Sequence, residues 1–106
     1  MQRDAPRSAT RDPGLLILAS LAAGPRHGYA MVEDIAAFGG ARLGPGTLYG
    51  ALARLEESGL IEPLDADDRR RPYRITAAGR DRLAGEIDAL ELVVLTVRDR
   101  LAEPSS

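Results

Sequence analysis

The chain has 106 residues, which suits a single domain, and a chain of this length buries roughly 60–70% of the surface that it exposes when unfolded. Apolar residues make up 44% and charged residues 28% of it, a balance typical of soluble globular proteins rather than disordered or fibrous ones. No apolar run approaches the roughly 20 residues that span a bilayer, and residues 1–7 lack the apolar stretch of a signal peptide. We therefore expect one cytoplasmic domain.

Residues suited to catalysis or metal binding are scarce. The sequence has no cysteine, which excludes disulfides, thiolate nucleophiles and cysteine-based zinc sites. Its single histidine, His27, cannot build a multi-histidine metal site. No paired carboxylates mark a recognisable catalytic pocket, so we expect neither an enzyme nor a bound cofactor or metal.

The charge is unevenly distributed along the chain. Fourteen basic and sixteen acidic residues give a net charge of −2, which alone argues against DNA as a partner. However, residues 41–82 hold eight basic and seven acidic residues, whereas residues 83–106 hold two basic and five acidic ones. All the basic residues are arginine, a bias that coding-sequence composition is sufficient to explain.

The first predicted helix follows a short N-terminal arm. Residues 1–11 carry three arginines and no apolar periodicity, which predicts a flexible arm. Asp12 and Pro13 suit the N-cap and first position of a helix, the run 15–21 is apolar, and Gly24 helps to end it. Because this helix is apolar nearly all round, we expect it to be buried on more than one side.

Two further helices are predicted after it. Apolar residues at helical spacing predict a helix over residues 28–38, and a third runs from Pro45 to just before Gly59. The predicted buried stripe of this third helix is Leu48, Leu52 and Leu55. The residues expected on or beside its opposite face are Thr47, Gly50, Ala51, Arg54 and Ser58.

A two-stranded hairpin and a long helix complete the chain. Residues 60–64 and 72–76 are strand-like, and the loop 65–71 between them balances three acidic residues with three arginines. From an N-cap at Thr76, a helix of roughly 37 Å is predicted to about residue 101. Its heptad seam is Leu83, Ile87, Leu90, Val94, Val97 and Leu101. Such a helix either folds over its own core or pairs with a second copy, and the seam favours pairing.

Two helices joined by a short turn and followed by a hairpin form the winged helix-turn-helix, whose second motif helix enters the DNA major groove. Residues 46–61, GTLYGALARLEESGLI, resemble the recognition helix of the PadR family of bacterial transcriptional regulators. Residues 27–31, HGYAM, and 70–79, RRPYRITAAG, resemble the family's helix opening and wing junction. The resemblance covers residues 15–101 and departs at Gly50, commonly proline in the family, and at His27, often aromatic.

The resemblance implies a mainly helical fold in three parts: an arm over 1–11, a winged helix-turn-helix DNA-binding domain over 12–76, and a dimerisation helix with a short tail over 77–106. It also implies a homodimeric repressor that binds a palindromic operator in double-stranded DNA. The DNA-binding residues expected are Tyr29, Thr47, Tyr49, Gly50, Arg54, Arg69, Arg70 and Arg71. A rival interpretation of the same fold is a protein–protein interaction module that does not bind DNA.

For several of these residues the sequence allows two different roles. Arg54 contacts a base edge or a phosphate, or else pairs with Glu57 on an exposed face. The tyrosines contact the DNA backbone or seal the helix pair with their hydroxyls at the surface. The wing arginines reach phosphates or form a solvated loop. A capping or surface position is favoured over a sensor role for His27.

Pairing of two chains would set the distance between two recognition helices, which must meet half-sites roughly 34 Å apart. The resemblance implies that the first and last helices form the interface, and together with the heptad seam the residues expected there are Leu15, Leu18, Leu21, Leu83, Ile87, Leu90, Val94, Val97 and Leu101. The single C-terminal helix resembles the short branch of the PadR family, and related regulators of that branch can hold a small apolar or aromatic effector between these helices. No aromatic residue follows Tyr73, so the last helix cannot stack on a planar ligand. The sequence therefore does not decide whether this protein binds an effector.

Overall fold

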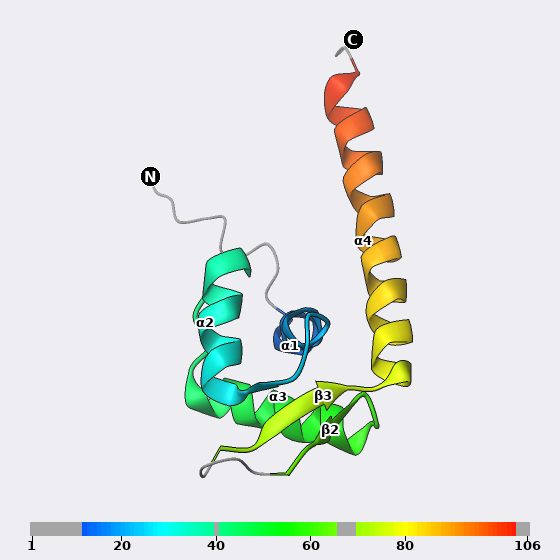
Figure 1. The fold of residues 1–106 in the computed structure, drawn as a ribbon. Coiled ribbons are helices and arrows are strands. Elements are labelled where there is room, and N and C mark those ends of the chain that lie inside the picture. Colours follow the sequence, from blue (N-terminus) through cyan, green and yellow to red (C-terminus); the bar gives the residue numbers. More distant parts are fainter. Residues whose placement is uncertain (1–11, 40, 66–69, 104–106) are drawn as a thin grey trace.

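The computed structural model describes residues 12–39, 41–65 and 70–103. Its helices are α1 (Pro13–Leu21), α2 (Gly28–Gly39), α3 (Pro45–Glu57) and α4 (Ala77–Ala102), and its strands are β1 (Arg26–His27), β2 (Ile61–Pro63) and β3 (Pro72–Ile75). The first three helices and the sheet form one body, from which α4 extends (Figure 1). This order confirms the predicted winged helix-turn-helix with a long C-terminal helix. The predicted arm over 1–11 lies outside the described residues.

Local capping rules explain why the helices start and stop where they do. Gly14 N donates to Asp12 Oδ1 at 3.1 Å at the start of α1, and Gly79 N donates to Thr76 Oγ1 at 3.0 Å at the start of α4. Just beyond α3, Gly59 has a φ of +76°, a left-handed conformation that glycine adopts without a steric cost. The predicted boundaries of these three helices are confirmed.

The sheet has three strands where the sequence predicted two. Strand β1 pairs with β3 through Arg26 opposite Tyr73 and His27 opposite Pro72, and β2 pairs with the other edge of β3. The extra strand is only two residues long, so it carries no alternation that a sequence could reveal. It ties the start of α2 to the wing, which we define as the β2–β3 hairpin (residues 61–75).

The core lies between α1, α2, α3 and the sheet. Ile17 of α1 is fully buried, as expected for a helix that is apolar nearly all round. Leu48, Leu52 and Leu55 are buried as predicted, but Ala51, expected on or beside the exposed face, is only 1% exposed. That expectation was wrong because Ala51 lies three residues after Leu48 and four before Leu55, on the same helical stripe.

Only the first turns of α4 pack on the body. Gly79 is buried and Leu83 packs against the core, whereas from residue 87 to 103 every residue except Thr96 is exposed. The radius of gyration is 16.2 Å, against about 13 Å for a compact chain of this length. Although α4 has 26 residues, neither it nor any other described helix is apolar enough along its length to cross a membrane.

Candidate nucleic-acid interface

The outer face of α3 carries polar side chains that the body does not cover. The buried leucine stripe fixes the rotation of the helix, so that Thr47, Tyr49 and Arg54 are exposed and Gly50 is half-exposed. Tyr49 keeps 59% of its surface exposed. Among the described residues no salt bridge involves Arg54, so the predicted alternative of an ion pair with Glu57 is not present in this conformation.

A hollow of about 510 Å³ lies between the start of α2, the exposed face of α3 and the wing. We call it the tyrosine hollow, and its lining residues are His27, Gly28, Tyr29, Tyr49, Arg70, Arg71 and Tyr73. Three phenol groups and two guanidinium groups therefore border one space, and none of the described lining residues is acidic. Phenols and guanidiniums donate hydrogen bonds, and this set suits an anion such as a phosphate.

Glycine at position 28 permits the close approach of α2 and α3 beside this hollow. A Cβ atom on Gly28 would lie 3.2 Å from Leu48 Cδ2 and 3.3 Å from the Tyr49 hydroxyl oxygen. Tyr49 thus leans from α3 across the start of α2 while most of its ring stays exposed. Tyr29 is 66% exposed, so both rings are accessible to a partner rather than sealed between the helices.

Tyr73 on β3 presents a neutral phenol to the same hollow. Burial raises the pKa of Tyr73 above 10.0, Glu56 and Tyr49 raise it further, and Arg71 opposes them. The hydroxyl therefore stays protonated at physiological pH and can donate a hydrogen bond.

The arginines of the wing divide into two groups. Arg74 is paired with Glu62 across the strands, with Nε donating to Oε2 at 2.9 Å, so its charge is already compensated. Arg70 and Arg71 are exposed and line the tyrosine hollow. Arg69 lies outside the described residues. Within the part of the chain that the structure describes, the charges available for an anion in this region come from Arg54, Arg70 and Arg71.

Three residues that line the hollow were not among the predicted DNA contacts: Gly28, which has no side chain, Tyr73 and His27. Tyr73 follows the alternation of β3, on which it shares a face with buried Ile75, and that pattern could have placed it beside the core. His27 Nδ1 accepts from Ala30 N at 3.4 Å, which fits the favoured capping position. The proximity of His27 to the wing depends on the β1–β3 pairing, which the sequence did not predict.

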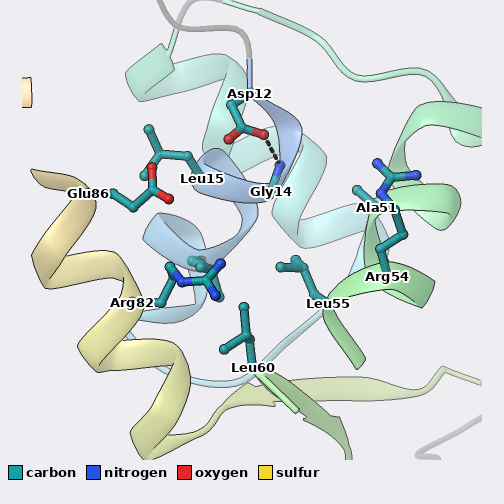
Figure 2. A pocket seen from close by; sticks show the side chains of 10 residues that line it. Asp12, Gly14, Leu15, Ala51, Arg54, Leu55, Leu60, Arg82 and Glu86 are labelled. Carbon is teal, nitrogen blue, oxygen red and sulfur yellow. Dashed lines mark hydrogen bonds between the residues drawn. The ribbon is translucent and has the colours of Figure 1, made fainter. Parts of the chain in front are cut away.

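A second hollow, of about 190 Å³, lies between α1, α3 and α4. Figure 2 shows Arg82 reaching into it from α4, with Arg54 on the α3 side and Leu55 and Leu60 between them. Its volume is below the 300–1,000 Å³ typical of sites for drug-sized ligands. A single protomer therefore offers little room for an effector at this place.

The predicted dimer residues divide between the core and the exposed surface. Leu18 and Leu21 are at most 2% exposed because they belong to the core of the protomer, and Leu15 is also largely covered. By contrast, the distal part of α4 leaves a series of large apolar side chains exposed. These are Ile87, Leu90, Leu92, Val93, Val94, Leu95, Val97 and Leu101, which we call the α4 apolar surface.

Comparisons with known proteins agree with this architecture. The sequence model described as "Transcriptional regulator PadR-like family" matches residues 17–85. "Transcriptional regulator Rv3488" of Mycobacterium tuberculosis is 41% identical over 92 residues, which cover 84% of this chain and 82% of that protein. The crystal structure of a PadR family transcription regulator from hypervirulent Clostridium difficile R20291 shares the fold, with a TM-score of 0.76 and 23% identity over 85% of this chain and 98% of that one.

Another relative is much longer. The "Uncharacterized 37.1 kDa protein in transposon TN4556" of Streptomyces fradiae is 49% identical over 81 residues, which cover 76% of this chain and 24% of that protein. The chain thus spans about a quarter of the length of this relative. The match to the family model begins within α1, ends within α4, and includes all of α2, α3 and the wing. On this evidence the chain belongs to the PadR-like family of transcriptional regulators.

Proposed function

We propose that this protein is a homodimeric, sequence-specific DNA-binding regulator that represses transcription from a palindromic operator. The observation that carries the proposal is the exposed face of α3 beside the tyrosine hollow, where Arg54, Arg70 and Arg71 are accessible. In this arrangement α3 enters the major groove, with Arg54 on a base edge and Thr47 near a phosphate. Tyr29, Tyr49 and the wing arginines hold the flanking backbone.

The distribution of charge supports the same orientation. The net charge of −2 comes largely from residues 83–106, most of which lie on the distal part of α4. That part extends away from α3 and the wing (Figure 1). Binding then depends on a few placed arginines rather than on a broad basic field.

The primary test is selection of bound fragments from a pool of random and genomic duplexes. A dimer should enrich palindromic sites with half-sites about one helical turn apart. Enrichment of no duplex at low salt would contradict the proposal. A stable complex with a protein partner through α3, without DNA binding, would instead support the interaction-module interpretation.

Arg54→Ala is expected to weaken binding to the selected duplex by roughly 5- to 150-fold, because one bidentate arginine–guanine contact contributes about 1–3 kcal/mol. Fluorescence anisotropy at constant salt measures this change. Arg100→Ala, which removes the same charge from the last turn of α4, is the matched control and should bind as the wild type does. If the two substitutions weakened binding equally, Arg54 would contribute only through its positive charge and not through a specific contact with a base.

Gly50→Ala separates folding from DNA binding. An added Cβ would meet only Arg54 Nη1, at 3.6 Å, which is an ordinary contact. Alanine should therefore raise the free energy of unfolding by roughly 0.5–1 kcal/mol through its helix propensity. It should also weaken DNA binding, because the methyl group stands on the face that approaches the groove. Denaturant melts and anisotropy measure the two effects, and unchanged affinity would mean that DNA does not approach α3 at this position.

An effector, where one acts, needs a site larger than the hollow of about 190 Å³ between α1, α3 and α4. The space between two paired α4 helices is the alternative, and its lining would be aliphatic. A ligand bound there would change DNA affinity only if it preferred one separation of the recognition helices.

A further inference from the structure

His27 makes two contacts that one neutral imidazole cannot hold together. Nδ1 faces Ala30 N at 3.4 Å, and Nε2 faces Arg70 Nη1 at 3.1 Å. Both partners are donors, so each contact needs a lone pair on the ring nitrogen. A neutral imidazole has one such nitrogen, and a protonated one has none. The neutral ring can therefore either cap the start of α2 through Nδ1 or accept from the Arg70 guanidinium through Nε2, but it cannot do both at once.

Protonation of His27 would change what the tyrosine hollow offers. It converts both ring nitrogens into donors, removes the acceptor for Arg70, and adds a positive charge beside those of Arg70 and Arg71. In the tautomer that holds Arg70, Nε2 would present a lone pair to a phosphate oxygen in the hollow, whereas the imidazolium presents a donor. Arg70, no longer held by the ring, is free to turn towards the same phosphate.

Among the described residues, no carboxylate lines the hollow beside the ring. From β1, Arg26 pairs with Asp34 of α2 at 3.9 Å. From α2, α3 and β3, the groups lining the hollow are the phenols of Tyr29, Tyr49 and Tyr73. Glu56 of α3 acts on Tyr73 but does not line the hollow.

We propose that His27 couples DNA binding to proton uptake, by exchanging its contact with Arg70 for a charge-assisted contact with a backbone phosphate in the tyrosine hollow. The proposal rests on the proposed DNA-binding function. By linkage, a ligand that prefers the protonated form binds more tightly as the pH falls through the titration range of histidine. The chain has one histidine and no cysteine, so His27 is the only side chain with an ordinary titration range between pH 5.5 and 7.5.

The test uses untagged protein and a 30-bp random-sequence duplex at 50 mM salt, because phosphate contacts do not require an operator. The wild type should bind threefold or more tightly at pH 5.5 than at pH 7.5. Calorimetry in buffers of different ionisation enthalpy should show proton uptake when the wild type binds DNA. The resonance of the single histidine, followed by NMR, should titrate at higher pH when DNA is added.

Two variants separate titration from structure. In His27→Asn the amide oxygen can still cap Ala30 N, and in His27→Gln it extends towards Arg70, but neither side chain gains a proton. Both should bind DNA with an affinity that is nearly constant between pH 5.5 and 7.5. A pH dependence retained in both variants, or absent in the wild type, would overturn the proposal for His27. The proposed DNA-binding function would not be affected by either result. No binding by the wild type at either pH would remove the proposed function and the inference with it.

Discussion

Gly79→Ala is expected to lower the free energy of unfolding by about 2–3 kcal/mol, the upper part of the range for an overpacked core. A Cβ at this position would lie 2.1 Å from the backbone oxygen of Leu60 and 2.7 Å from Ile75 Cγ1. A backbone oxygen cannot move as the end of a flexible side chain can. Relief of the clash therefore requires α4 to shift away from the sheet.

The position of Gly79 makes this shift costly. Its N–H donates to Thr76 Oγ1, and the same hydroxyl donates to Gly59 O at 2.7 Å. Thr76 N in turn donates to Leu60 O at 3.1 Å. The N-cap of α4, the end of α3 and the start of the wing are thus joined at one point, and moving α4 disturbs all three.

Thermal unfolding followed by circular dichroism at a fixed protomer concentration measures the effect of Gly79→Ala, which should lower Tm by roughly 10–20 °C. Gly85→Ala is the matched control in the same helix, because nothing lies within 4 Å of its added Cβ. It should raise the free energy of unfolding by roughly 0.5–1 kcal/mol. If Gly79→Ala were as stable as the wild type, the close packing of α4 on Leu60 would not be a feature of the folded protein.

Most of the fold was predicted from sequence patterns that lie within a single helix or at its ends. Asp12, Thr76 and Gly59 act on the backbone within a few residues of themselves, so capping rules place the helix ends without knowledge of the tertiary structure. The leucine stripe of α3 was also visible in sequence. Ala51 was misplaced because its small side chain is a weak hydrophobic signal, although its position on the stripe was available from the spacing.

The parts that the sequence did not predict depend on contacts between distant segments. Strand β1 exists because Arg26 and His27 meet β3 some 45 residues later, and two residues show no periodicity. The tyrosine hollow depends on this pairing, so the exposed residues of α3 could be predicted but their grouping with His27 and Tyr73 could not. The burial of Leu18 and Leu21 similarly required knowledge of which sides of α1 the protomer itself covers.

Leu90→Glu combined with Val94→Glu is expected to convert the proposed dimer into a monomer and to weaken operator binding by 100-fold or more. Both side chains lie on the α4 apolar surface, with Leu90 41% and Val94 46% exposed in the protomer. Placed in a coiled-coil seam against a second copy, four carboxylates would be brought together in an apolar interface, which strongly disfavours pairing.

The loss of DNA affinity follows from the geometry of two linked sites. In a dimer the second half-site is bound at a high effective concentration, which raises the overall affinity by about 10²–10⁴ over that of one half. A monomer retains the α3 face and the tyrosine hollow but loses this gain. Its binding should therefore become weak and independent of half-site spacing, while its winged helix stays folded because the substituted residues lie outside the core.

Sedimentation velocity measures whether the double variant is a monomer, and anisotropy on the same samples measures its affinity for the operator. Ala89→Glu is the control, because it adds a carboxylate next to Leu90 but on the opposite side of the heptad. This variant should remain dimeric and bind the operator as the wild type does. If the double variant stayed dimeric, the seam of α4 would not be the interface. If it became monomeric without losing affinity, each winged helix would read its site alone and the palindromic operator would have no physical basis.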